Sequence, residues 1–390
     1  MKSVHLILFV VFCALALRGN TQTSNDTIWS YQLLTKIQAL QRTNTGFPPG
    51  IFPSTRVYAY NKNNSKNDPN VFFTGLIVYT LKKYQKQCTP YQQGIIKQIV
   101  KDGLSSVGLF KNKSGRDTYN FWRTDTPQIF PNAGLLNKFD KSQSLPDDFD
   151  DTVILLWAQG VSRDRAAVIH DSMQLYANNK VKTVKNTLAP FKNLPAYSTW
   201  FGKKMPIDFD MAVLCNVLSF VNAYDLQWTA SDSASLQLIT TAIDNKWHLN
   251  KADFIAPHYA KPAVIMYHIA RLLTAGNQQN IQTLIALKPI LLKQTDSLLT
   301  ISKDPLENVL LSSARVQFGG ITNITSQALD QAAIEQSKYP FFIANMASML
   351  PSPVKRPLSK LAFAKFEYRC PAYNLALLWE NRYLCVPLHK

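Results

Sequence analysis

The chain has 390 residues, 46% of them hydrophobic, and its 42 basic and 25 acidic side chains give a formal net charge of +17. Such a charge attracts anionic partners, including glycans, lipids and nucleic acids. The basic residues are scattered, however, and neither zinc-finger spacing nor an aromatic nucleic-acid signature accompanies them, so we expect no nucleic-acid partner. No low-complexity linker interrupts the sequence, which favours a single domain.

The N-terminal residues have the pattern of an export signal. Lys2 precedes an apolar run over residues 6–17, and small and polar residues follow. Because this run is too short to span a bilayer, we expect residues 1–23 to be a cleaved signal peptide. The mature protein, residues 24–390, is then secreted or periplasmic. No later stretch is apolar over the length that a bilayer requires, so no transmembrane segment is predicted.

Four cysteines follow the predicted cleavage site, and four cysteines allow three disulfide pairings. Cys370 and Cys385 are close in sequence, which favours a disulfide between them. Cys215 lies in an apolar helical segment and is expected to be a buried thiol. Because the chain has no C-x-x-C pair, we predict no cysteine metal site. We assign neither a metal ion nor a cofactor, and a calcium or magnesium site on clustered carboxyl groups stays open as an alternative.

A proline-led pattern recurs along the chain. Residues 146–153 read Pro-Asp-Asp-Phe-Asp-Asp-Thr-Val, residues 206–213 read Pro-Ile-Asp-Phe-Asp-Met-Ala-Val, and an aliphatic helical segment continues each. Pro257 opens a third copy. Apolar segments expected to be helices also follow Pro69, Pro340 and Pro371. Six apolar helices alternating with amphipathic ones predict an all-α fold, an (α/α)6 toroid of repeated helical hairpins.

In such a toroid the six inner helices all begin at one end, so the two Asp-Phe-Asp segments are expected around one mouth. Residues 108–146 show little helical pattern, and connections of this length are often functional. We expect them to form either a pocket wall or an ordered cap. The residues predicted to bind substrate are Arg116, Tyr119, Asn120, Phe121, Trp122, Arg123 and Asn132 from this connection, with Asp208 and His258 from the later repeats.

An acidic cluster marks the start of the helix predicted after Pro146. Asp147, Asp148, Asp150 and Asp151 place four carboxyl groups in five positions. Like charges this close raise the pKa of at least one of them, and a carboxyl group that stays protonated suits general-acid catalysis. The alternative is structural, because aspartates at a helix start cap free N–H groups and lower their own pKa values.

The segment Asp148-Phe149-Asp150-Asp151-Thr152 resembles the DxDDT motif of class II terpenoid cyclases, whose catalytic domains are α/α toroids. The resemblance implies that Asp150, the middle aspartate, protonates an alkene or epoxide, with Asp148 and Asp151 as supporting acids. Aromatic side chains in the 119–122 stretch would then stabilise carbocations through their π faces. An acid-catalysed enzyme of this kind is our first expectation.

Two other functions stay open. Asp150 and Asp210 occupy equivalent repeat positions, and two carboxyl groups flanking a sugar are typical of glycoside hydrolysis. The chain is then a glycan-active hydrolase or lyase, and Asp210 joins Asp148, Asp150 and Asp151 as a predicted catalytic residue. Alternatively, the same mouth binds a ligand without catalysis. In each case we expect a monomer with a small-molecule or glycan ligand.

Overall fold

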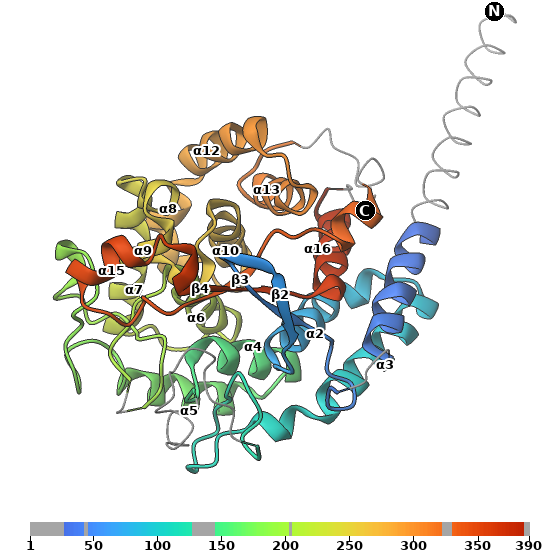
Figure 1. The fold of residues 1–390 in the computed structure, drawn as a ribbon, viewed down its shortest axis with the longest axis horizontal. Helices are drawn as coiled ribbons and strands as arrows, with labels where there is room; N and C mark the ends of the chain where they lie inside the picture. Colours follow the sequence, from blue (N-terminus) through green and yellow to red (C-terminus); the bar gives the residue numbers. More distant parts are fainter. Residues whose placement is uncertain (1–26, 43–45, 127–144, 203–204, 322–329, 386–390) are drawn as a thin grey trace, which may run out of the picture.

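A computed structural model describes residues 27–42, 46–126, 145–202, 205–321 and 330–385 (Figure 1). The predicted signal peptide over 1–23 and the predicted ligand-binding residue Asn132 lie outside these residues. Within the described part of the chain, no helix has the length and apolar character needed to cross a membrane, as the sequence predicts.

Six central helices are buried on most of their faces, as expected for helices that are apolar nearly all round. They contact one another in cyclic order, and the last helix contacts the first. These central helices are α2 (Phe72–Tyr84), α4 (Phe149–Gln159), α6 (Met211–Ala223), α10 (Pro262–Thr274), α13 (Pro305–Gln317) and α16 (Pro371–Cys385).

Amphipathic helices pack around the central ones. For example, α3 (Pro90–Ser105) buries Ile96 and Ile99 on the side that meets α2, and most of its other side chains remain at least partly exposed. This group comprises the helix over 27–42 together with α3, α5 (Arg163–Gln174), α7 (Ala230–Asp244) and α12 (Lys288–Ile301). Shorter helices are α8 (Trp247–Asn250), α9 (Ala252–Ile255), α11 (Gln282–Ile285), α14 (Gln331–Glu335) and α15 (Ser352–Leu358).

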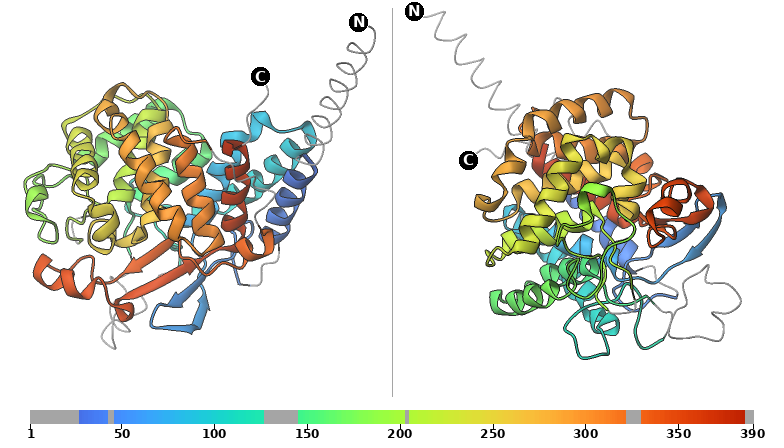
Figure 2. Two further views of the ribbon diagram at one scale, coloured as in Figure 1. Left: turned by 90° about the horizontal axis from the view of Figure 1, so that it is seen from above. Right: turned by 90° about the vertical axis from the view of Figure 1, so that its left-hand side faces the viewer.

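A four-stranded antiparallel sheet lies across one end of the central helices (Figures 1 and 2). Its strand order is β2-β1-β4-β3, so β1 pairs with strands from both ends of the chain. β4 leads directly into α16, and β2 is followed by α2. The strands are β1 (Thr55–Tyr58), β2 (Asn61–Asn67), β3 (Phe342–Asn345) and β4 (Lys365–Arg369).

This sheet shows that the predicted all-α class, and with it the (α/α)6 toroid, is wrong. The clearest local error follows Pro340, where an apolar helix was expected and β3 is found. The strands could not be predicted from the sequence because three of them have only 4 or 5 residues, too few to show a clear alternation of apolar and polar side chains. The seven-residue β2 consists of Asn, Lys and Ser, and Asn and Lys are depleted in strands.

The cysteines also correct one prediction. Among the described residues Cys370 is a free, buried thiol, so the expected disulfide between Cys370 and Cys385 is wrong. Cys370 lies at the end of β4, immediately before α16, whereas Cys385 ends that helix, and a helix of 15 residues holds the two too far apart. The expectation that Cys215 is a buried thiol is confirmed.

Candidate active site

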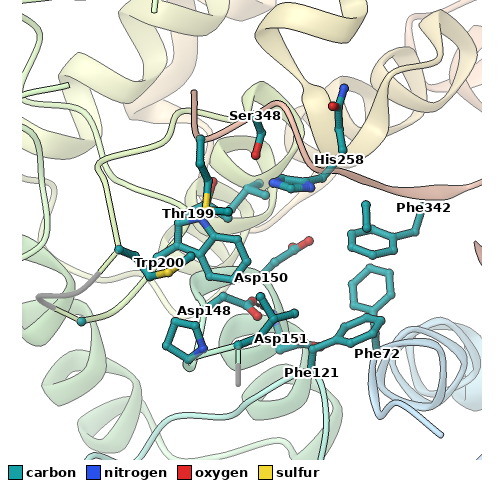
Figure 3. A pocket seen from close by; sticks show the side chains of 18 of the residues that line it. Phe72, Phe121, Asp148, Asp150, Asp151, Thr199, Trp200, His258, Phe342 and Ser348 are labelled. Atoms are coloured by element: carbon teal, nitrogen blue, oxygen red, sulfur yellow. Dashed lines mark hydrogen bonds between the residues drawn. The ribbon is translucent and has the colours of Figure 1, made fainter. Parts of the chain in front are cut away.

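A pocket of about 750 Å³ lies between the N-terminal ends of central helices and the sheet (Figure 3). Three kinds of side chain line it: carboxyl groups from the start of α4, aromatic rings from several elements, and methionines. Its main lining residues are Asp148, Asp150, Asp151, Phe72, Phe121, Trp200, His258, Phe342, Tyr368, Met205, Met346 and Met349.

The carboxyl groups come from the N-terminus of α4 and are almost completely buried, with Asp148, Asp150 and Asp151 at most 6% exposed. Asp148 is the N-cap of the helix, because its side chain accepts a hydrogen bond of 2.7 Å from the backbone N–H of Asp151. Of the three carboxyl groups, only that of Asp148 caps α4, so capping does not explain why Asp150 and Asp151 are buried beside it.

Asp150 is held by donors from two other elements. The Nδ2 group of Asn216 on α6 donates to Oδ1 over 2.7 Å, and the Tyr259 hydroxyl donates to Oδ2. Burial raises the pKa of Asp150, although both donors and the positive charges of Arg271 and His258 oppose that rise. Because each oxygen accepts a hydrogen bond, the site is suited to the carboxylate form of Asp150.

Asp148 and Asp151 behave as a pair. Burial raises the pKa of Asp148 to about 7, and its interaction with Asp151 opposes a larger rise. Burial, followed by the charge of Asp148, raises the pKa of Asp151 well above its usual value. The Oδ1 atom of Asp151 is buried and receives no hydrogen bond from a donor group of the described chain. The two carboxyl groups are therefore suited to share one proton near neutral pH.

The sequence predicted a raised pKa in this cluster from repulsion between like charges. The direction agrees with the structure, but burial is the largest cause for all three groups. Repulsion between neighbouring carboxylates adds to it at Asp148 and Asp151.

Aromatic rings form the wall opposite Trp200, and the carboxyl groups lie between the two sides (Figure 3). The ring centroid of Phe342 lies 5.1 Å from that of Phe72 and 5.5 Å from that of Phe121. Tyr368 packs against both Phe121 and Phe342. These rings come from α2, the connection after α3, and the strands β3 and β4, so the sheet completes the pocket.

Trp200 and His258 form the remaining side. Trp200 forms an isolated antiparallel β-bridge with Asp148. Its indole meets the imidazole of His258 edge to face, with ring centroids 6.0 Å apart. The imidazole also stacks on Phe342, with ring planes 18° apart. The backbone N–H of His258 donates to the Asp210 carboxylate over 2.8 Å.

His258 belongs to a buried cluster of charged side chains that also contains Asp208 and Lys355. Nε2 of His258 lies 3.7 Å from Oδ2 of Asp208, and Nζ of the buried Lys355 lies 3.6 Å from Oδ1. Burial alone would raise the pKa of Asp208, but Lys355 and His258 outweigh it and lower that pKa. Burial likewise opposes protonation of His258, yet Asp208 and Asp210 outweigh it and raise the pKa of the imidazole.

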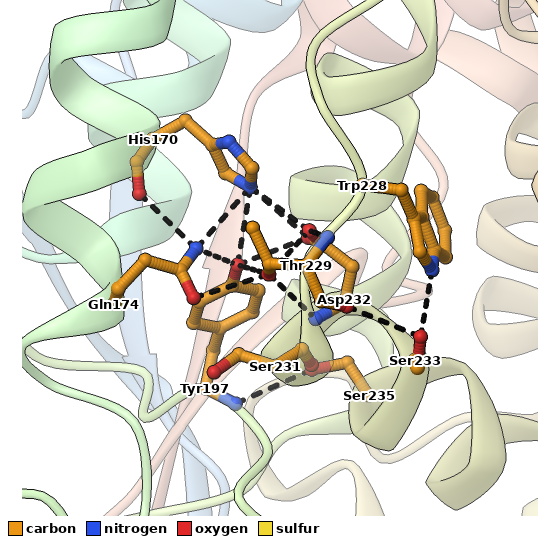
Figure 4. Close-up of polar contacts among 9 residues, drawn as sticks. All are labelled: His170, Gln174, Tyr197, Trp228, Thr229, Ser231, Asp232, Ser233 and Ser235. Atoms are coloured by element: carbon orange, nitrogen blue, oxygen red, sulfur yellow. Dashed lines mark hydrogen bonds and ion pairs between the residues drawn. The ribbon is translucent and has the colours of Figure 1, made fainter.

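A second polar network positions the segment that carries Trp200 (Figure 4). Nε2 of His170 on α5 lies 3.0 Å from the Asp232 carboxylate on α7, and the Tyr197 hydroxyl donates to the same carboxylate over 3.0 Å. This network joins two outer helices to residue 197. Thr199 and Trp200 follow two and three residues later and line the pocket.

Of the residues predicted to bind substrate, three line the pocket: Arg116, Phe121 and His258. Arg116 forms two hydrogen bonds of 2.7 and 2.8 Å with the carboxylate of Asp147, so its charge is already paired. Asp147 itself is fully buried by this contact and by a bond from Thr118.

The other predicted binding residues point elsewhere. The Tyr119 hydroxyl bonds Gln159, and the Asn120 amide donates to a backbone carbonyl. Trp122 donates to Asp68, and Arg123 forms an ion pair near the surface. Asp208, and Asp210, which was predicted to be catalytic, are fully buried and are not among the pocket-lining residues. Both Asp210 oxygens accept backbone N–H groups, at the start of α6 and from His258.

Sequence reasoning missed most of the aromatic wall. The Pro69 copy of the repeat placed a helix start beside Phe72, which was a usable signal. Phe342 and Tyr368 lie on strands that were not predicted, and Trp200 lies in an irregular segment. No local pattern marked these three as neighbours of Asp150.

Comparison of the chain with protein-family models, with characterised proteins and with solved structures gave no match. The function must therefore be argued from the pocket itself. Within the described residues, no group of three or more His, Cys, Asp or Glu side chains is placed to hold a metal ion.

Proposed function

We propose that this pocket is the active site of an enzyme that protonates an apolar substrate carrying an alkene or epoxide and so starts a carbocation rearrangement or cyclisation. The observation that carries the proposal is the buried carboxyl pair of Asp148 and Asp151, which faces packed aromatic rings across a cavity of about 750 Å³. Such a cavity has the size of a small-molecule site. We also propose export of the mature protein, from the pattern over residues 1–23.

The chemical step needs no group beyond these residues. The acid of the Asp148–Asp151 pair gives its proton to the substrate. A C–H bond forms as a π bond breaks, or an O–H bond forms as an epoxide C–O bond breaks. The resulting cation lies near the faces of Phe72, Phe121 and Phe342, whose π electrons stabilise positive charge. Loss of a proton from carbon then forms the product alkene and returns the proton to the carboxylate pair.

The resemblance to class II terpenoid cyclases assigns the proton donor to Asp150. In the structure, Asn216 and Tyr259 donate to both oxygens of that carboxyl group, which favours its ionised form. We therefore assign the transferred proton to Asp148 and Asp151. Asp150 then stabilises positive charge in the pocket as a carboxylate.

The glycan-active alternative depended on Asp150 and Asp210 flanking one substrate. The geometry favours it less, because Asp210 does not line the pocket and both of its oxygens bond backbone N–H groups. Ligand binding without catalysis is the remaining alternative, and turnover measurements separate it from the enzyme.

Turnover is measured on acyclic polyprenols and their terminal epoxides, with products analysed by mass spectrometry. We expect Asp148→Asn and Asp151→Asn each to lower turnover by roughly 100-fold or more, since both remove the acid but keep the shape. Asp164→Asn, at an exposed position in the first turn of α5, is the matched control and should leave turnover unchanged. Full activity in both pocket variants excludes the proton-transfer role.

A binding experiment tests the same pocket without requiring the natural substrate. A carbocation-stabilising site should prefer dodecyltrimethylammonium to dodecanol, because only the former is cationic. We expect this preference to be lost in Phe342→Leu and in Asp150→Asn. Equal affinity for both probes in the wild-type protein contradicts the proposed charge preference, whatever the turnover assay gives.

A further inference from the structure

The segment between β3 and β4 projects from the sheet end of the molecule with apolar side chains in solvent. We call residues 346–364 the β3–β4 lobe; it includes α15 and a short turn of helix before β4. Val354, Leu361 and Phe363 are 45%, 42% and 55% exposed. Three large apolar side chains are therefore exposed within residues 354–363.

Basic residues accompany these apolar side chains. Arg356 and Lys360 are exposed on the same lobe, and the described lobe has no acidic residue. The β1–β2 hairpin lies on the same side of the molecule in both views of Figure 2. It adds Tyr60, which is 58% exposed, and the exposed Lys62 and Lys66, of which Lys62 also lies 3.7 Å from the Glu367 carboxylate of β4. Apolar and basic groups therefore occur together on two neighbouring projections.

The lobe is continuous with the pocket. Met346 and Met349 belong to it and line the cavity, and both are only partly buried. A surface that receives the lobe would therefore lie next to the methionine side of the pocket.

We propose that the β3–β4 lobe and the β1–β2 hairpin form a docking surface for an anionic lipid bilayer. The apolar side chains would enter the interface, and the basic residues would contact anionic headgroups. The formal net charge of +17 favours the same kind of partner. This inference goes beyond the proposed reaction, since it concerns where the protein acts and needs only that the pocket takes an apolar ligand.

Co-sedimentation of the mature chain, residues 24–390, with phosphatidylcholine vesicles, with and without phosphatidylglycerol, tests the proposal. We expect binding to the anionic vesicles, weakening as salt increases. Leu361→Ser/Phe363→Ser should lower the partition coefficient about tenfold or more, because exposed side chains lose apolar insertion. Arg356→Gln/Lys360→Gln should lower it about tenfold on anionic vesicles only.

The matched control is Val168→Ser/Leu175→Ser, because these side chains are 66% and 62% exposed but belong to α5 and its C-cap. Their replacement should not change vesicle binding. The proposal fails if wild-type protein ignores anionic vesicles, or if control and lobe variants lose binding equally. It also fails if the lobe variants alter only self-association, measured by sedimentation velocity, since the surface then receives a second copy.

The ammonium-probe assay separates this proposal from the proposed function. Lobe variants should bind dodecyltrimethylammonium as the wild-type protein does, because they leave the pocket lining intact. If vesicle binding is absent while the probe preference persists, the docking surface is refuted and the pocket assignment stands. If the probe preference is absent while vesicle binding persists, the pocket assignment is refuted and the docking surface stands.

Discussion

Two Asp-Phe-Asp segments occur in this chain, and the structure uses them differently. Phe149 donates its N–H to Thr199, and Thr199 donates its N–H to Asp208, so the two segments flank one irregular stretch. The first segment presents Asp148 and Asp150 to the pocket. In the second, Asp208 pairs with buried cations and Asp210 caps α6, so neither lines the pocket.

The difference comes from partners supplied by distant parts of the chain. Lys355 comes from α15, far along the sequence, and compensates the charge of Asp208. No described basic side chain forms an ion pair with Asp148, Asp150 or Asp151, so burial raises the pKa of each. The same local pattern therefore forms part of the acidic pocket at residues 148–150 and has a structural role at residues 208–210. The variants below test that distinction.

The largest effect is expected at Asp208. Asp208→Asn leaves Lys355 as a buried cation without its carboxylate, and breaking a buried ion pair in this way costs about 3–5 kcal/mol of unfolding free energy. Urea denaturation at neutral pH measures it. A loss no larger than the roughly 1 kcal/mol typical of a surface pair would place Asp208 in solvent rather than in the core.

The acid pair should show its own pH dependence. The pKa of Asp148 is raised to about 7 in the folded protein, so its contribution to stability is complete below its unfolded pKa and is lost as pH rises through about 7. Asp148→Asn keeps the helix cap but cannot ionise. The stability difference between wild type and variant should change by about 2–3 kcal/mol between about pH 5 and pH 8.

Denaturant unfolding at both pH values provides that measurement. A wild-type protein whose stability relative to Asp148→Asn stays constant across this range would show that the carboxyl group is accessible to water. The comparison between the two Asp-Phe-Asp segments would then lose its electrostatic basis.

A smaller effect is expected from the cap of α6. Asp210→Ala removes an N-cap acceptor, and losing such a cap costs about 1–2 kcal/mol. Thermal denaturation gives the size of the loss. Asp210→Asn, which keeps an acceptor oxygen, should recover most of the stability; if it does not, the charge of Asp210 matters more than its hydrogen bonds.

The smallest effect is expected at Arg123, one of the residues that the sequence predicted to bind substrate. It pairs with Asp125 near the surface and does not line the pocket. Arg123→Ala should leave dodecyltrimethylammonium affinity unchanged in calorimetric titration. A clear loss of affinity would mean that the pocket extends beyond its described lining.

The sequence predicted what depends on local pattern and missed what depends on long-range pairing. The start of α4 and the burial of Cys215 follow from short-range apolar and capping signals, and both are found. β4 could not be predicted from local pattern, because it is stabilised by pairing with β1 and β3, which are distant from it in the sequence.

The site shows the same division. Asp148, Asp150 and Asp151 were singled out because four acids crowd one helix start, and all three line the pocket. Tyr119 and Trp122 were expected there because their loop is aromatic, yet hydrogen bonds to Gln159 and Asp68 turn their polar atoms to other partners. Composition indicated a functional segment, but only tertiary contacts decide which of its side chains reach the cavity.

The pairing of β1 with β4 has a consequence for how the protein is made. These strands come from opposite ends of the chain, as do the contacting helices α2 and α16. Closing so large a loop is entropically costly and slows folding. During synthesis the apolar faces of α2 and α4 emerge long before Phe342 and Tyr368 exist to cover them. The nascent chain therefore passes through a period in which its apolar surface needs protection from aggregation.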